Sequence, residues 1–167
     1  MNQPRSILLE LQYFPPVQYF SKLLSYPSVL IEQHEHYVKG SFRNRCHIAS
    51  VQGVQRLSIP LRKGKNQRLP IREVEIAYDE PWQSQHWTAL QSAYGNSPFF
   101  DFFADELEPF FRKKHQFLFE LNWELLHLVG RFLRLKSELR LTETYLHELP
   151  PEALDFRGKI LPKHPME

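Results

Sequence analysis

The segment KGSFRNRCHI, at residues 39–48, concentrates the side chains best suited to bind an anion. The range 37–72 contains nine lysines and arginines and no aspartate or glutamate. Lys39, Arg43 and Arg45 stand at alternate positions, so on one extended strand their side chains would share a face. Arginine holds phosphate or carboxylate with two parallel hydrogen bonds, and lysine contributes a point charge. The segment therefore predicts an anion-binding surface, and the alternative is a charged edge strand in solvent.

The same segment places Cys46 beside His47, two residue types that together can form a nucleophile and its base. A reactive thiolate needs a nearby base or cation, but adjacent side chains of a strand point to opposite faces. The two side chains would therefore not meet in an extended segment. Because free cysteines are commonly buried as small apolar residues, we expect Cys46 to be structural.

Histidines elsewhere in the chain suggest two further kinds of chemistry. Glu32, His34 and His36 alternate and would share a strand face, and such a trio can hold zinc or another transition metal. No second group of ligands accompanies them, so we predict a solvated or hydrogen-bonded histidine pair and no metal site. On a helix, His86 would lie near Trp82 and Tyr94, as a proton carrier or as a hydrogen-bonded core residue.

The elements that must position these residues begin with an alternation of strand and helix. Residues 6–14 predict a buried strand that ends at two prolines, 17–24 predict an amphipathic helix, and 28–32 predict a second strand. This order is the opening of a βαβ unit. A basic hairpin with its turn near Gly53 follows, and a further strand is predicted at 71–78.

Helical patterns dominate after Pro81. They cover residues 82–94, a segment that is interrupted at Pro109, and residues 116–135. We therefore predict an α/β or α+β fold, with a mixed sheet opened by the βαβ-like unit and the basic hairpin and followed by a helical C-terminal half. Residues 1–141 are predicted to form the single domain, and the proline-rich residues 142–167 to form a tail.

Composition excludes several classes of protein. The 167 residues are 42% hydrophobic and 14% aromatic, which is typical of a globular chain with a real core. The net charge of +2 conceals a split, because outside the basic range 12 basic residues face 19 acidic ones. One cysteine allows no internal disulfide, and no secretory or membrane-spanning segment is predicted, so the expected compartment is the cytoplasm.

Several short motifs taken together resemble one known family. QYFPPVQYF, YVKGSFRNRCHI, GVQRLSIPL, PIREVEI, PWQSQHW and SAYGNSPFF follow one another in the order typical of the WbqC-like family of bacterial proteins. The resemblance runs from about Leu11 to Phe119. It implies a role in surface-polysaccharide (O-antigen) biosynthesis, with transfer of an amino-acid or acyl group to a sugar. Similar proteins often carry asparagine at position 46, which argues against a cysteine nucleophile. They also continue past the end of this chain, which implies a truncation after Glu167.

Three functional hypotheses follow from the charge pattern and the resemblance. The first is a transferase that acts on a small phosphate-bearing substrate such as a nucleotide sugar; neither a cofactor nor an oligomeric state is predicted. The second is a nucleotidyltransferase-like enzyme, although the first strand-loop-helix lacks the usual His and Gly of such a phosphate loop. The third is a non-catalytic module that binds an anionic ligand. Nucleic-acid binding is not expected, because several interleaved aromatic residues are missing from the basic stretch.

The transferase hypothesis assigns a role to particular residues. The candidate catalytic residues are His86, Asn44 and Tyr94. The candidate substrate-binding residues are Gln12, Tyr19, Lys39, Arg43 and Arg45. In this hypothesis the cations hold the phosphates, Asn44 orients a carbonyl or hydroxyl, and His86 transfers a proton. The loop Gln12–Gln18 is expected at the carboxyl edge of the sheet, beside the start of a helix.

Overall fold

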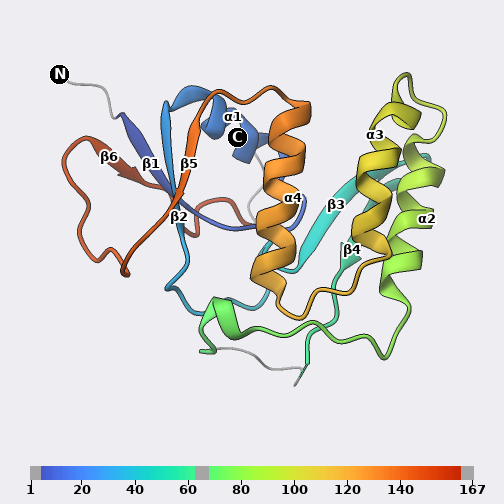
Figure 1. Cartoon of the computed structure of the whole chain (residues 1–167), viewed down its shortest axis with the longest axis horizontal. Coiled ribbons are helices and arrows are strands. Elements are labelled where there is room, and N and C mark those ends of the chain that lie inside the picture. Colours follow the sequence, from blue (N-terminus) through green and yellow to red (C-terminus); the bar gives the residue numbers. More distant parts are fainter. Residues whose placement is uncertain (1–4, 63–67, 163–167) are drawn as a thin grey trace.

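The structure, a computed structural model, describes residues 5–62 and 68–162. Its strands are β1 (Ser6–Glu10), β2 (Ser28–Glu32), β3 (Arg45–Ser50), β4 (Gly53–Ser58), β5 (Glu138–Leu141) and β6 (Ala153–Asp155). Its α-helices are α1 (Val17–Ser25), α2 (Trp82–Tyr94), α3 (Phe100–Leu107) and α4 (Leu118–Phe132), and two short 3-10 helices are η1 (Ile71–Glu73) and η2 (Glu108–Phe111). The fold is mixed α/β, as predicted, with three of its four α-helices in the second half of the chain (Figure 1).

The main sheet has four parallel strands in the order β5-β2-β1-β6. The predicted βαβ opening is confirmed, because β1 and β2 pair in parallel from Ser6 with Ser28 to Glu10 with Glu32. Side chains of β1 are buried on both faces, as is usual for a central parallel strand. All four strands point the same way, so their carboxyl ends meet at one edge of the sheet, and this edge carries the candidate site.

The predicted basic hairpin is formed by β3 and β4. The strands pair in antiparallel register from Arg45 with Ser58 to Ser50 with Gly53. Gly53 adopts a φ of 109°, which is open to glycine and strained for other residues. The turn of the hairpin therefore lies at the predicted position, next to Gly53. Cys46 and Leu57 face the core, whereas the alternate positions of both strands face outward.

The helices assemble beside the parallel sheet. Figure 1 shows α4 between the sheet and the pair formed by α2 and α3. Helix α4 is amphipathic, and its buried residues include Leu118, Leu121 and Leu125. The predicted interruption at Pro109 is also confirmed: α3 ends at Leu107, and the chain continues as η2, because proline cannot donate the backbone hydrogen bond of an α-helix.

Two predicted strands differ from the observed structure. Residues 71–78 do not form a strand: η1 follows Pro70, and the rest makes only isolated bridges, Leu61 with Ile76 and Glu75 with Phe117. The first hairpin strand begins at Arg45, and the residues before it form turns in which Gly40 has a φ of 82°. Lys39, Arg43 and Arg45 therefore do not share one strand face, which corrects that prediction.

Residues beyond 141 contribute to the main sheet. Strand β6 pairs in parallel with β1, with Ser6 opposite Ala153 and Leu8 opposite Asp155. Ile160 is 3% exposed and belongs to the hydrophobic core. The predicted division of the chain at residue 141 stays a prediction, and the structure shows that the described part of the tail packs against the domain.

Candidate functional site

A pocket of about 380 Å³ opens at the carboxyl edge of the parallel sheet. One wall is the loop after β1 together with the first turn of α1, and it contributes Phe14, Pro16, Val17 and Gln18. The pocket lies at the end of a parallel strand and beside a helix start, the usual position of ligand sites in α/β proteins. No side chain caps the N-terminus of α1. In its first turn the Tyr19 N–H donates to the Pro16 carbonyl at 2.9 Å, and the N–H groups of Val17 and Gln18 come before it.

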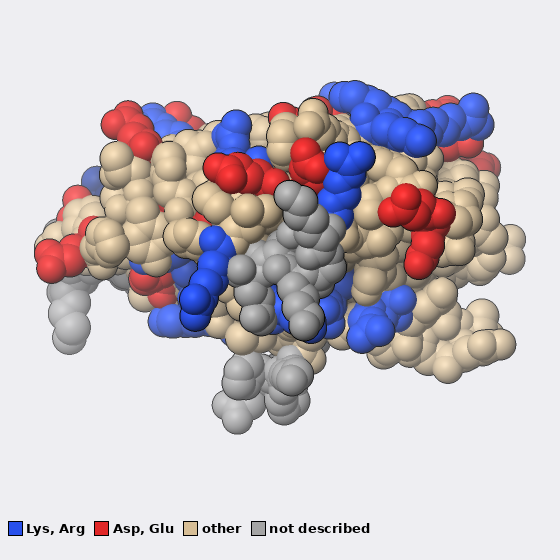
Figure 2. All heavy atoms as spheres, turned by 90° about the horizontal axis from the view of Figure 1, so that it is seen from below, with Lys and Arg blue, Asp and Glu red and all other residues tan. Residues whose placement is uncertain are grey.

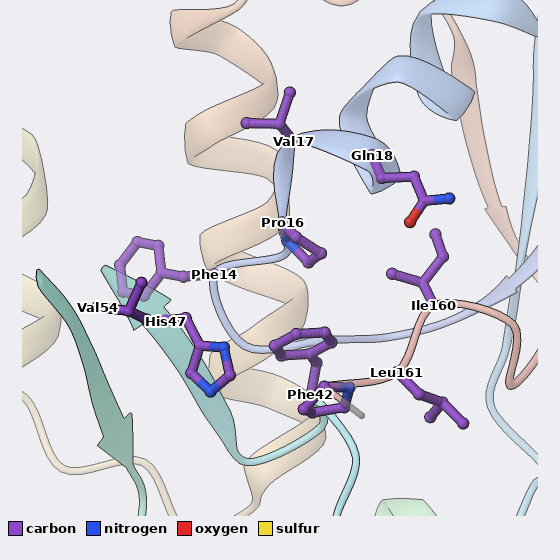
Figure 3. Close-up of a pocket in the computed structure, with 10 residues that line it drawn as sticks. Phe14, Pro16, Val17, Gln18, Phe42, His47, Val54, Ile160 and Leu161 are labelled. Carbon is purple, nitrogen blue, oxygen red and sulfur yellow. The ribbon is translucent and has the colours of Figure 1, made fainter. Parts of the chain in front are cut away.

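The hairpin and the C-terminal segment form the other walls. The hairpin side consists of Phe42, His47 and Val54, and Ile160, Leu161 and Pro162 complete the lining. Figure 3 shows the Phe42 ring at the centre of the pocket, with Pro16 above it and His47 beside it. The rings of Phe42 and His47 meet edge to face, with centroids 5.4 Å apart. The lining is mainly apolar, and Gln18 and His47 are its polar side chains.

Basic residues continue from this pocket along the outer face of the hairpin. His47 stands directly opposite Arg56 in the antiparallel register, and Arg45 lies two residues before His47. Residues directly opposite in an antiparallel pair, and residues two apart on a strand, share a face. We call Arg45, His47 and Arg56 the outer basic face. None of the ion pairs formed among the described residues includes Arg45 or Arg56.

Three of the predicted site residues line a second, smaller pocket of about 170 Å³. Lys39, Asn44 and Arg45 meet there with Tyr37 and with residues 59–61. Asn44 is held on both sides, because its Nδ2 donates to the Ile59 carbonyl at 2.9 Å and its Oδ1 accepts from the Tyr37 hydroxyl at 2.9 Å. The Nε atom of Arg45 is buried without a hydrogen-bond partner in the described part of the chain.

Arg43 points into the protein. Its Nε and Nη2 donate to the two carboxylate oxygens of Glu35 at 2.7 and 2.6 Å, and both side chains are buried. Burial raises the pKa of Glu35, and the hydrogen bond and charge of Arg43 oppose that rise. The Arg43 Nη1 atom is buried and has no partner among the described residues. The anion that Arg43 binds in this structure is thus the protein's own carboxylate.

The remaining predicted substrate-binding residues join a buried polar cluster at the same sheet edge. The Tyr19 hydroxyl donates to the Glu10 carbonyl at 3.0 Å, and Gln12 Nε2 donates to Glu10 Oε1 at 2.8 Å. The C-terminal segment closes this cluster, because the Gly158 N–H donates to Glu10 Oε2 at 2.8 Å and Arg157 Nη1 to Glu32 Oε2 at 3.0 Å. Gln12 and Tyr19 are almost fully buried and do not line the pockets described above.

The predicted catalytic residues His86 and Tyr94 lie on α2 and do not line either pocket. His86 is buried, and its Nδ1 is 2.9 Å from the Tyr13 hydroxyl. The centroids of the His86 and Trp82 rings are 5.1 Å apart. Burial lowers the pKa of His86 to about 4, so its imidazole is neutral at pH 7. The Tyr94 hydroxyl accepts a hydrogen bond from the Ala49 N–H at 3.1 Å and so ties α2 to β3.

Cys46 is a buried free cysteine on the core face of β3, and burial raises the pKa of its thiol to about 12. Because the thiolate is the reactive form, we expect the folded protein to resist alkylation by iodoacetamide at pH 8. The protein unfolded in urea should be labelled at a rate at least about a hundredfold higher, which mass spectrometry of timed samples would measure. Equal rates in the two states would contradict the burial of this thiol.

Two of the three possible metal ligands, Glu32 and His34, make hydrogen bonds with other groups. Glu32 Oε1 accepts hydrogen bonds from the His34 N–H at 2.9 Å and from the Thr142 hydroxyl at 2.8 Å. The His34 ring bonds to the Thr142 carbonyl at 3.1 Å, and His36 is exposed. Within residues 5–62 and 68–162, no group of three or more His, Cys, Asp or Glu side chains is arranged to hold a metal ion.

Charged side chains of both signs are spread over the face that Figure 2 views from below. Asp and Glu lie in its left, upper and right parts, and Lys and Arg form a large group at the upper right and smaller groups along its lower part. In the part of the chain that the structure describes, no helix is both long and apolar enough to cross a bilayer.

The sequence predicted one wall of the larger pocket, the loop Gln12–Gln18, but not the residues of the other walls. His47 was considered only as a partner for Cys46, and Phe42 was not singled out. A usable signal was present for His47, because it shares the strand parity of Arg45 and so had to lie on the same face. Nothing local indicated that Phe42 would face the loop after β1, since this depends on the Tyr13 N–H donating to the Phe42 carbonyl at 2.9 Å.

Comparison with known proteins gives one family and one distant relative. The model of the WbqC-like protein family matches residues 11–157. A protein of Mycobacterium tuberculosis described as uncharacterized is 29% identical over 143 residues, which make up 85% of this chain. The chain spans 61% of the length of that relative. No solved structure matches the chain.

Proposed function

Because the chain belongs to the WbqC-like protein family, we propose that it is a transferase of bacterial surface-polysaccharide assembly. In this proposal it acts on a phosphate-bearing substrate such as a nucleotide sugar and adds an amino-acid or acyl group. The observation that carries the proposal is the meeting of three features at one sheet edge: the pocket, the uncapped start of α1 and the outer basic face.

The phosphates would lie on the outer basic face. Arg45 and Arg56 are free of ion pairs with described residues, so an incoming phosphate would not have to displace a carboxylate. Lys39 adds a further charge beside Arg45 in the smaller pocket. Arg43 is a less suitable ligand, since Glu35 already occupies its fork. We therefore assign the anion to Lys39, Arg45 and Arg56 and give Arg43 the role of fixing the loop before β3.

Two histidines, His86 and His47, are candidates for the base of the proposed transferase. A transferase that uses an amine or hydroxyl nucleophile needs a base within hydrogen-bond reach of it. His86 is neutral at pH 7 and is bonded to Tyr13, whereas His47 lies in the pocket itself. The proposed roles of His86, Asn44 and Tyr94 require each to exchange a hydrogen bond that it makes in this structure.

Those occupied hydrogen bonds favour a second candidate, an anion-binding module without catalysis. The two candidates share the outer basic face and differ in whether bound substrate is consumed. Incubating the protein with a panel of nucleotide sugars and acyl or amino-acid donors, and following product by mass spectrometry, would separate them. Turnover supports the transferase, and saturable binding without turnover in every combination supports the module. Exchange of pyrophosphate into ATP would instead indicate the nucleotidyltransferase-like alternative.

Binding of inorganic pyrophosphate tests the anion site shared by these functions. We expect the double variant Arg45→Ala and Arg56→Ala to bind pyrophosphate at least about tenfold more weakly by calorimetry, because each charge-assisted hydrogen bond contributes about 1.5–3 kcal/mol. Both side chains lie on the outer face, so the fold should survive. The matched control is Arg112→Ala, which removes an exposed arginine paired with Glu108. Equal weakening by the control, or no weakening by the double variant, would remove the proposed anion site.

A further inference from the structure

We propose that the larger pocket binds the nucleobase of the substrate, so that the ligand is a nucleoside diphosphate derivative held by its base and by its phosphates. The inference rests on the proposed function for its phosphate contacts. It adds the chemical class of the other end of the ligand and the side chains that would recognise it.

The rings in the pocket lining favour a flat ligand ring that can stack on them. Phe14, Phe42, Pro16 and Pro162 contribute rings to the lining. Phe14 is partly exposed, and Phe42, which is 7% exposed, is fixed by its edge-to-face contact with His47, so the two rings form a rigid aromatic wall. Any nucleobase can stack on such a surface, whatever polar groups its edge carries, because every base has a π-face. Figure 3 shows the central position of this ring.

The polar groups in the pocket are few and of the kind that a base edge requires. Gln18 presents an amide that can donate and accept, and His47 presents a ring nitrogen. A sugar ring in the same place would lose the hydration of several hydroxyl groups and find only these two side chains as partners. Burying unpaired hydroxyls is costly, so the lining fits a base better than a sugar.

The phosphates of a base bound there can reach positive groups on two sides. The first turn of α1 contributes Val17 and Gln18 to the lining, and its N–H groups have no side-chain cap. On the other side, Arg56 stands opposite His47 in the hairpin register, and Arg45 lies about 6.6 Å further along β3 at 3.3 Å per residue. The remainder of the ligand then extends toward the smaller pocket, where Lys39 lies.

The backbone at Phe14 is a separate indication of function. Phe14 has a φ of 40° although it is not glycine and precedes Pro15, a position where the helical regions are disfavoured. Residues held in such conformations cluster at ligand sites, where the surrounding structure fixes them. The ring of Phe14 stacks on that of Phe111 at 6.3 Å, and this contact holds the strained residue in the pocket wall.

Calorimetry with inorganic pyrophosphate, uridine diphosphate and adenosine diphosphate tests the inference. We expect at least one nucleoside diphosphate to bind at least about tenfold more tightly than pyrophosphate, and Phe42→Leu to abolish this advantage while pyrophosphate binding is retained. Gln18→Ala should reduce the preference between the two bases. The matched control is Phe102→Leu, which alters an exposed phenylalanine of α3.

A second variant covers the case in which Phe42→Leu does not fold. Val54 is 78% exposed and lines the mouth of the pocket, so Val54→Trp should fill the mouth, leave the core intact and abolish the nucleotide advantage. Equal affinity for pyrophosphate and both nucleotides, or an advantage that survives Val54→Trp, overturns the base site and leaves the proposed function standing. Absence of all binding, pyrophosphate included, overturns both. Competition by an alkyl phosphate as strong as that by the nucleotides would assign the pocket to an aliphatic chain and also overturn the inference.

Discussion

Replacing Arg43 with alanine will destabilise the protein by about 3–5 kcal/mol, because it leaves a buried charge without its partner. The substitution leaves the Glu35 carboxylate buried opposite an empty space, and burial already acts to raise the pKa of this group. The two hydrogen bonds at 2.7 and 2.6 Å disappear with the guanidinium. Urea unfolding followed by circular dichroism at pH 7 measures the loss as a lower transition midpoint.

Two further variants show whether the loss comes from the unpaired carboxylate. Arg112→Ala removes an exposed ion pair with Glu108 and should change stability by less than about 1 kcal/mol. The double variant Arg43→Met with Glu35→Leu removes both charges and should recover much of the stability, because apolar replacements of a buried pair are often neutral. A loss below about 1 kcal/mol for Arg43→Ala would mean that Glu35 does not depend on Arg43, and would return Arg43 to the list of free anion ligands.

Lowering the pH from 7 to 4 will remove about 3 kcal/mol of stability through His86 alone. The pKa of His86 is lowered from its ordinary 6.5 to about 4, because burial beside Trp82 and Tyr13 penalises the imidazolium. Between these two values the unfolded chain takes up a proton that the folded protein does not. The stabilisation is therefore complete above pH 6.5 and is lost as the pH falls toward 4. Urea midpoints at half-unit steps of pH would record this slope.

Comparison with His86→Gln isolates this contribution from that of other groups. Glutamine retains a side-chain amide that can bond to the Tyr13 hydroxyl but does not titrate, so the difference in unfolding free energy between the two proteins should shrink between pH 6.5 and 4. His127→Gln, which changes an exposed histidine of α4, should leave the slope as in the wild type. Parallel curves for the wild type and His86→Gln would show that His86 is solvated and free to titrate.

Local signals explain which parts of the fold could be predicted. The apolar run before Pro15 and Pro16 predicted β1, and the spacing of apolar residues predicted α1, α2 and α4. Gly53 predicted the turn of the hairpin. Strands β5 and β6 were not predicted, because each is short and is defined by its pairing with a strand more than a hundred residues earlier in the chain. The imperfect alternation after Pro70 failed as a strand signal, since proline favoured a 3-10 turn there.

The site was predictable in its location and charge more than in its residues. The loop after β1 lies at the carboxyl edge beside a helix start, and basic side chains of the hairpin lie next to it. The alternation of side chains along a strand did not predict the direction of the Arg43 side chain, because the chain turns at Gly40 and residue 43 is not in a strand. The Arg43 side chain instead points to Glu35, to which it donates a hydrogen bond. His86 was selected because it would lie near Trp82 and Tyr94 on a helix, yet the structure buries it against Trp82.

The place of β6 beside β1 has a consequence for synthesis of the protein. Ser6 leaves the ribosome long before its partner Ala153, because the two residues lie far apart in the chain. During that interval one edge of β1 has unpaired N–H and C=O groups that any other extended segment could bind. The edge of β1 that β6 covers in the folded protein is thus open to pairing with other chains until Ala153–Asp155 have been made.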